Sequence, residues 1–412
     1  MRILPISRAA CALAAVALVV GAADAKTLRW ANRGDMQTTD PHSQNEGLTN
    51  NINSLVYEFL TDRDKKLGLR PALAESWQRI NDTTWRFKLR SGVKFHDGTP
   101  FTADDVVFSY ERARADTSQL RVYTTRAGVP KKIDDLTVEF TTPAPNPTQL
   151  EDVATINIMS KAWCEKNRAT KPQNYGAKED MITARQANGT GPYMLKSREP
   201  DVKTVLVKNP NWWGIKTGLS DGNVDEVVFT PINSDATRLA ALISGEIDLI
   251  NDPPPQDVPR LKQTPNIKVI EGVENRVVFI GMDQNRDELL YSNVKGKNPF
   301  KDKRVRQALY QAIDIDAIQK QVMRGQSRPT GAMVPSPSAS FPDLEPRLLP
   351  HDPARAKKLL AEAGYPDGFE LGLLCPNNRY VNDERICTAI AGMFAKIGVN
   401  VRLNSMPRAQ FF

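Results

Sequence analysis

The stretch TWRFKLRSGVKFHDGTPFTADDVVFSYERA, residues 84–113, predicts a strand and a helix joined by a polar turn. Trp85, Phe87 and Leu89 alternate with basic residues, which is the period of two typical of a half-buried strand. Asp-Gly-Thr-Pro at residues 97–100 favours a turn, because glycine and proline readily adopt the backbone angles that turns require. The stretch contains no catalytic motif. It therefore predicts scaffold rather than chemistry.

The second half of the stretch has the signals of a helix start. Thr102 is placed to cap the helix, and Asp105 follows three residues later as a variant of the capping box. Val106, Val107 and Tyr110 then recur at helical spacing. We therefore expect a capped helix that buries one face.

This stretch resembles the signature of the family 5 extracellular solute-binding proteins, which serve peptide- and nickel-type ABC importers. Five further runs resemble the family as well: NGTGPYML (188–195), VKNPNWW (207–213), INSDATRLAALISGEIDLI (232–250), NPFKDKRVRQALYQAIDIDAI (298–318) and AKKLLAEAGYPDGF (356–369). The resemblance covers essentially the whole chain after residue 25.

The resemblance implies an α/β protein with the two-lobed, type II periplasmic-binding-protein-like fold and mixed sheets. Lobe 1, with a subdomain, is expected at residues 26–272 and lobe 2 at residues 273–412. Members of the family continue beyond the point that corresponds to Phe412. We therefore expect lobe 2 to be incomplete and the chain to be truncated at its C-terminus.

Periodicity supports an α/β second lobe independently of the resemblance. Residues 369–374 and 399–403 have the pattern of strands, and residues 383–397 that of a helix between them. A strand–helix–strand order argues for a parallel crossover. Upstream, the apolar residues of 277–282 predict a strand that enters this lobe.

The first 25 residues predict a cleaved signal peptide. Arg2 and Arg8 give a positive start, residues 9–20 an apolar core, and Ala-Asp-Ala at 23–25 a cleavage site. We expect the mature protein to start at Lys26 and to be periplasmic. The apolar core is too short for a permanent membrane span, which needs about 20 residues.

Composition and motifs exclude several function classes. The net charge is +7, but acidic and basic residues are interleaved, which predicts a mixed solvated surface and no nucleic-acid binding. His42, His96 and His351 are too scattered for a metal site, and neither a Walker A sequence nor a serine-nucleophile motif occurs. We expect no enzyme activity, no metal and no cofactor.

Two local features leave alternatives open. The pair His96-Asp97 has the order of a catalytic base and its orienting carboxylate, but a turn that satisfies its own polar groups is favoured because no nucleophile motif accompanies it. The pair Trp212-Trp213 fits either a stacking platform for a ligand or a plug in the core of one lobe, and the plug is favoured.

Three cysteines lie outside the predicted signal. An oxidising compartment permits a disulfide between Cys375 and Cys387, which is sterically plausible. The Cα separation decides whether it forms, and the sequence does not supply that distance. Free thiols at both positions therefore remain the alternative, and Cys164 is expected to be a buried thiol.

The resemblance also places candidate ligand-binding residues, by position in the family. They are Arg33, Gly34 and Asp35 in an early loop, and Asp283, Gln284 and Asn285 after the strand that enters lobe 2. Arg33 is expected to pair with a ligand carboxylate, and Asp35 or Asp283 with an amine. Ordinary loop charges are the alternative for each.

The function implied is that of a monomeric periplasmic substrate-binding subunit of an ABC importer. Such a protein captures peptides between its lobes by hinge closure and delivers them to the membrane permease. Nickel, sugars and opines stay open as cargo. Two other classes also stay open, an exported two-lobed hydrolase and a ligand sensor for a receptor.

Overall fold

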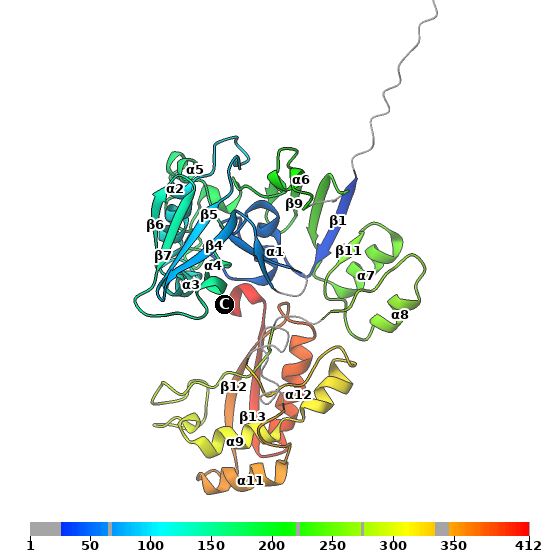
Figure 1. Cartoon of the computed structure of the whole chain (residues 1–412). Coiled ribbons are helices and arrows are strands. Elements are labelled where there is room, and N and C mark those ends of the chain that lie inside the picture. The colour runs from blue at the N-terminus through cyan, green and yellow to red at the C-terminus, as the bar shows by residue number, and fades with distance from the viewer. Residues whose placement is uncertain (1–25, 65–67, 220–222, 273–275, 334–345, 412) are drawn as a thin grey trace, which may run out of the picture.

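The computed structural model describes residues 26–64, 68–219, 223–272, 276–333 and 346–411. The predicted signal peptide, residues 1–25, lies outside the described residues. The described chain forms two bodies, an upper one built from residues 26–272 and a lower one built from residues 276–411 (Figure 1). The last short helix of the lower body lies where the two bodies meet.

A mixed five-stranded sheet runs through one side of the upper body, in the order β11-β1-β10-β9-β8. Its strands are β1 (Thr27–Asn32), β8 (Tyr193–Glu199), β9 (Lys203–Lys208), β10 (Glu226–Pro231) and β11 (Leu249–Ile250). β1 pairs in parallel with both β10 and β11, whereas β8, β9 and β10 pair antiparallel. The first strand therefore lies inside the sheet, between two strands from the end of this body.

The other side of the upper body is an antiparallel four-stranded sheet, in the order β4-β5-β7-β6. Its strands are β4 (Ala74–Asn81), β5 (Thr84–Leu89), β6 (Val129–Asp134) and β7 (Thr137–Thr141). The strand and helix predicted within residues 84–113 are confirmed as β5 and α2 (Ala103–Ala113), which also shows the predicted capping box. The Thr102 backbone N–H donates to the Asp105 carboxylate at 2.9 Å.

Short elements connect these sheets. They are α1 (Gly47–Val56), β2 (Thr61–Arg63), β3 (Leu69–Pro71), α3 (Arg121–Ala127), α4 (Gln149–Val153), α5 (Lys161–Lys166), η1 (Ile182–Ala184), α6 (Trp213–Lys216), α7 (Asp235–Ser244) and α8 (Val258–Gln263).

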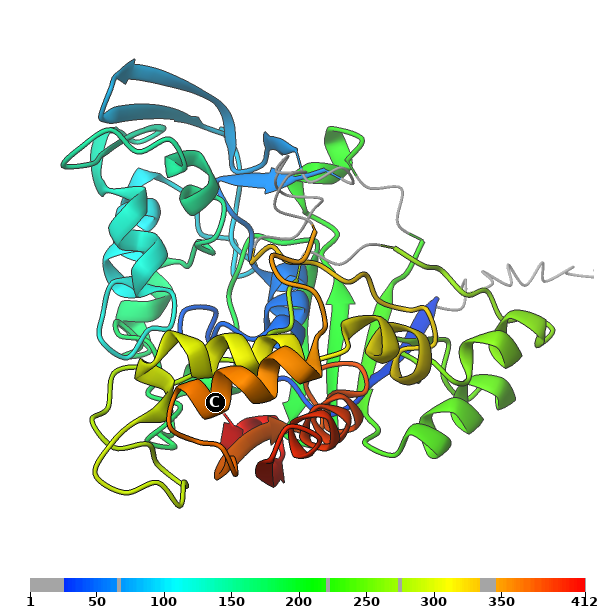
Figure 2. The ribbon, with the colours of Figure 1, turned by 90° about the horizontal axis from the view of Figure 1, so that it is seen from below.

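The lower body is built around two parallel strands, β12 and β13, joined by α12. Its elements are η2 (Pro299–Lys301), α9 (Lys303–Ala312), α10 (Ile315–Ala317), η3 (Ile318–Val322), α11 (Pro353–Glu362), β12 (Phe369–Pro376), α12 (Asp383–Ala395), β13 (Val399–Met406) and α13 (Arg408–Phe411). The predicted parallel crossover is confirmed. The helices α9 and α11 lie side by side across this body (Figure 2).

The strand predicted at residues 277–282 is wrong. Residues 276–282 form no strand in the structure, and Val278 and Phe279 are 53% and 60% exposed. An extended apolar segment becomes a strand only where a neighbouring strand offers its backbone groups. The two-stranded sheet β12-β13 does not pair with it.

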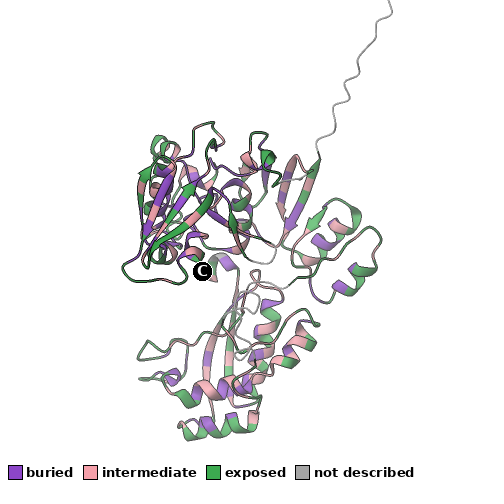
Figure 3. Cartoon of the chain, viewed as in Figure 1, coloured by how far each residue is buried: buried purple, intermediate pink, exposed green. Residues whose placement is uncertain are grey.

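The two bodies have separate apolar cores. The lower body buries one cluster that includes Leu309, Leu360 and Phe394, all from residues 289–399. The clusters of the upper body draw only on residues before 273. Buried residues accordingly lie on the strands inside each body and on one face of the helices that pack against them (Figure 3). What joins the bodies is therefore mainly polar.

Candidate functional site

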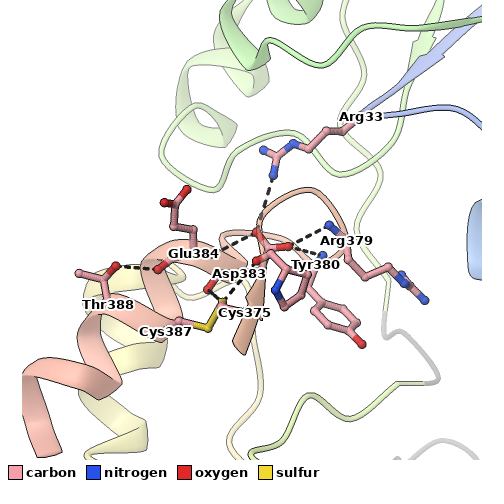
Figure 4. Close-up of a disulfide and its surroundings, with 9 residues drawn as sticks. Arg33, Cys375, Arg379, Tyr380, Asp383, Glu384, Cys387 and Thr388 are labelled. Carbon is pink, nitrogen blue, oxygen red and sulfur yellow. Dashed lines mark hydrogen bonds and ion pairs between the residues drawn. A yellow bond between two sulfur atoms is a disulfide. The ribbon is translucent and has the colours of Figure 1, made fainter. Parts of the chain in front are cut away.

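Arg33 spans the two bodies. It follows β1, and its Nη2 pairs with the Asp235 carboxylate at 2.6 Å within the upper body. Its Nη1 lies 3.4 Å from the Asn377 carbonyl oxygen and 4.0 Å from Asp383 Oδ1, both in the lower body (Figure 4). The predicted ligand arginine thus already has carboxylate partners, one of them across the interface.

Gly34 and Asp35 contact Arg408 of the lower body at the same interface. Gly34 has a φ of +76°, and a Cβ at this position would lie 3.1 Å from Nη2 of Arg408. The Arg408 guanidinium also donates to the Asp35 carbonyl oxygen. The Asp35 carboxylate faces Arg198 at 3.4 Å and accepts the Asp201 N–H at 2.9 Å. Burial raises the pKa of Asp35, and its carboxylate is committed to the upper body.

Glu46 is the acidic centre of the interface. It caps α1 by accepting the Leu48 and Thr49 amides at 3.2 and 2.9 Å. From the lower body, Arg408 Nη1 approaches its Oε1 to 3.1 Å and Arg379 Nε to 3.6 Å. Burial opposes ionisation, but Arg408 and the capping amides hold the pKa of Glu46 below its ordinary value. One carboxylate therefore receives two guanidinium groups.

Arg379 is incompletely satisfied. Its Nε is buried and finds no hydrogen-bond acceptor among the described residues. The guanidinium instead stacks over Tyr380, 4.9 Å from the ring centroid, and Arg276 lies 5.5 Å from the same centroid. Burial first, and the neighbouring Arg276 second, lower the pKa of Arg379. The guanidinium groups of Arg276 and Arg379 thus lie at one aromatic ring, and neighbouring guanidinium groups are the local chemistry that attracts an anion.

The loop between β12 and α12 carries Arg379 and Tyr380. Its ends are joined by a disulfide between Cys375 and Cys387, whose Cα atoms lie 6.5 Å apart (Figure 4). The distance that the sequence left open thus permits the bridge. Cys164 is a buried free thiol, and burial raises its pKa to about 12.

Asp283, Gln284 and Asn285 form a local turn. The Asp283 carboxylate accepts the Asn285 and Arg286 amides at 3.0 and 3.3 Å and pairs with the Arg286 side chain. No hydrogen bond or ion pair links residues 283–285 to residues 33–35, all of which the structure describes. The structure therefore does not bring the two predicted halves of the site together.

The pair Trp212-Trp213 holds a buried carboxylate. Both indole N–H groups donate to Glu58, at 3.1 and 3.0 Å. Trp213 also packs against the apolar core and lies under the Arg90 guanidinium at 4.1 Å. Burial raises the pKa of Glu58 to about 7, because hydrogen bonds from the two indoles compensate it only in part. This arrangement favours the core interpretation over a ligand platform.

His96-Asp97 belongs to a turn that satisfies itself. His96 Nε2 bonds the Gly191 carbonyl at 3.1 Å, and Asp97 accepts the Thr99 amide at 3.0 Å. The ring also accepts the Gly189 amide at 3.3 Å. Both ring nitrogens are therefore occupied in holding the loop at residues 188–191, which favours the turn interpretation.

The sequence did not single out Glu46, Arg276, Arg379, Tyr380 or Arg408. These residues are far apart in the chain, and each taken alone is an ordinary loop or cap residue. One weak signal was present, since Asn-Asn-Arg-Tyr at 377–380 sits between a predicted strand and helix, where parallel α/β folds place ligand-binding loops.

The described residues offer neither a metal site nor a membrane span. Within residues 26–64, 68–219, 223–272, 276–333 and 346–411, no group of three or more histidine, cysteine or acidic side chains could hold a metal ion. In the same residues, no helix has the length and apolarity that a membrane span requires.

Comparison with known proteins places this geometry in context. The sequence model of the bacterial extracellular solute-binding proteins, family 5 Middle, matches residues 68–412. The dipeptide-binding protein of Escherichia coli K12 is 31% identical, over 95% of this chain and 74% of its own length. Heme-binding protein A of Haemophilus influenzae is 30% identical, over 95% of this chain and 76% of its own length. The structure of the ABC transporter-associated periplasmic binding protein DppA from Helicobacter pylori, in complex with the peptide STSA, matches with a TM-score of 0.79 and 25% identity, covering 93% of this chain and 74% of that one.

Proposed function

Because the chain belongs to the family 5 bacterial extracellular solute-binding proteins, we propose that it is the exported substrate-binding subunit of an ABC importer. Its α/β architecture with mixed sheets is that of the periplasmic binding proteins, as the sequence predicted. Residues 26–272 and 273–412 act as the two lobes in this proposal. The ligand is held where they meet, and the loaded protein docks on the permease.

Peptides are the cargo that the proposal favours. The similar proteins include a dipeptide-binding protein and one whose structure is in complex with the peptide STSA. In this chain, the observation that carries the assignment is the incompletely bonded guanidinium of Arg379 at the interface. A peptide has a carboxylate at its C-terminus, and arginine binds carboxylates in a planar, two-bond geometry.

The residues predicted from family position contribute unequally. Arg33 belongs to the proposed site because it reaches the loop that carries Arg379. Gly34 and Asp35 shape the wall behind Glu46 and Arg408. Asp283, Gln284 and Asn285 are engaged in their own turn and form no part of the proposed site in this conformation.

Isothermal titration with a mixed library of di- to pentapeptides tests the proposal, beside the same library with amidated C-termini. We expect heat of binding and a raised Tm with free carboxylates, and affinities lower by about tenfold or more for the amides, since a charge-assisted pair is lost. The variant Arg379→Ala should respond to both libraries alike.

The matched control is Arg185→Ala, which removes an arginine from an exposed pair with Asp180. It should bind the free peptides as the unaltered protein does. No heat with either library would contradict the peptide assignment and leave membership of the family intact.

A further inference from the structure

We infer that Asp383 and the Cys375–Cys387 disulfide are positioning residues, which fix the loop at 377–382 so that Arg379 faces the upper body before a ligand arrives. The inference rests on the proposed function, because it assigns these residues a part in solute capture. From the sequence, no part in ligand binding was expected for Asp383, Cys375 or Cys387.

Asp383 shapes the loop from inside. Its Oδ2 accepts the backbone amides of Arg379 and Tyr380, at 2.8 and 3.0 Å (Figure 4). The side chain is only 3% exposed. Two amides bonded to one buried carboxylate oxygen fix the backbone from which both side chains of the site project.

The same carboxylate is coupled to the other body. Its Oδ1 accepts the Glu384 amide at 3.0 Å and lies 4.0 Å from Nη1 of Arg33. Arg33 also approaches the carbonyl oxygen of Asn377, at the start of the loop. One carboxylate, that of Asp383, thus both fixes the conformation of the loop and lies near a cation of the upper body.

The disulfide fixes the ends of the loop. Cys375 is next to last in β12, and Cys387 lies in the first turns of α12, with a sequence separation of 12. Both cysteines are buried. Within this span, Asn382 adopts a φ of +54°, a left-handed conformation that asparagine tolerates better than most residues, and its side chain donates to the Val322 carbonyl oxygen at 2.9 Å.

Preorganisation matters here because the Arg379 side chain does not hold itself in place. Among the described residues, its guanidinium approaches Glu46 to 3.6 Å and stacks on Tyr380, and its Nε has no hydrogen-bond acceptor. Its position therefore depends on the backbone of the loop. A loop ordered in advance spares the ligand the entropy cost of ordering it, which raises affinity.

Hydrogen exchange of the ligand-free protein tests the structural half of the inference. We expect Asp383→Asn and the pair Cys375→Ala with Cys387→Ala each to speed exchange at the amides of Arg379 and Tyr380 by about tenfold or more. Val305→Ala, which trims the apolar core of the lower body on α9, serves as the control for a general loss of stability. Unchanged exchange at both amides in Asp383→Asn and in the double variant would overturn the inference.

Binding of the di- to pentapeptide library tests the functional half. The loop variants should bind about tenfold more weakly than the unaltered protein, while Val305→Ala at a similar Tm keeps its affinity. Equal losses in all variants would reduce the disulfide and Asp383 to general stabilisers and overturn the inference. If the unaltered protein binds no peptide, the proposed function fails at that step, and the exchange experiment still decides whether these residues fix the loop.

Discussion

Two clusters of arginine and carboxylate in this molecule use the same residue types and differ in how completely they are bonded. Inside the upper body, Arg112 makes two bonds to Asp40, at 2.6 and 2.8 Å, and donates to the carbonyl oxygens of residues 169 and 171. At the interface, Arg379 approaches Glu46 only to 3.6 Å and leaves its Nε without a hydrogen bond among the described residues.

The difference separates structure from recognition. A guanidinium whose donors are all bonded to the protein stabilises the fold and has nothing left to offer a ligand. A buried guanidinium with donors to spare costs stability unless a ligand completes it. The complete cluster is therefore expected to affect folding when it is mutated, and the incomplete one to affect binding.

The largest effect is expected from Arg112→Ala. The change leaves Asp40 buried without its cation, so we expect a loss of about 3–5 kcal/mol in the free energy of unfolding. Urea denaturation measures this. A loss below about 1 kcal/mol would remove the distinction between the two clusters.

The pH dependence of stability extends the comparison to a third carboxylate, Glu58, which has two indole donors and, within the part of the chain that the structure describes, no cation bonded to it. Its pKa is raised from 4.5 to about 7 in the folded protein, so the folded state binds more protons in this window. The contribution of Glu58 to stability should therefore fall as pH rises from 4.5 to 7, by about 3 kcal/mol at most. Burial lowers the pKa of His42 to about 4, so His42 contributes with the opposite sign in this window, and only a comparison with a Glu58 variant isolates the Glu58 slope.

Glu58→Gln should remove that slope in urea titrations at several pH values. The contribution of Asp40 to stability should have the opposite pH dependence, at lower pH. Burial raises the pKa of Asp40, but Arg112 outweighs this effect and helps to hold the pKa at about 2. Its contribution is present above pH 3.8 and is lost as pH falls toward 2. The same pH dependence of stability in the unaltered protein and in Glu58→Gln would contradict the assignment for Glu58.

A smaller loss is expected from Arg408→Ala. Glu46 would lose the nearer of its two cations but would keep its bonds to the capping amides. We expect a loss of about 2 kcal/mol, measured by urea denaturation. A loss as large as that of Arg112→Ala would mean that the interface is as complete as the interior cluster.

The smallest effect on stability is expected from Arg379→Ala. Since its guanidinium has few bonds to lose, the free energy of unfolding should change by less than about 1 kcal/mol. Urea denaturation without ligand gives the free energy of unfolding, and titration of the same preparation with peptides gives the affinity. A large loss of stability together with unchanged binding would reverse the roles of the two clusters.

Local pattern predicted much of the fold, because strand alternation, helix caps and turns are properties of neighbouring residues. The capped helix α2 and the β12-α12-β13 crossover are examples. The segment 277–282 shows the limit, since its apolar pattern did not reveal whether a partner strand was there to pair with it.

The candidate site was less predictable for the same reason. Glu46 caps a helix and Arg408 opens a short one, and only the packing of two bodies brings them to 3.1 Å. Arg33 was predicted by position in the family, but its partners Asp235 and Asp383 follow from tertiary structure. Residue type indicated charge, and the fold decided which charges were left incompletely bonded.

The place of β1 inside its sheet has a consequence for the order of folding. Its two neighbours, β10 and β11, end at residues 231 and 250, so the first strand has no partner until most of the upper body has been synthesised. Pairings between such distant residues form slowly, because the loop between them must first lose its conformational entropy. Sheet order thus acts as a built-in delay, which leaves β1 without its sheet partners until residue 250 has been made.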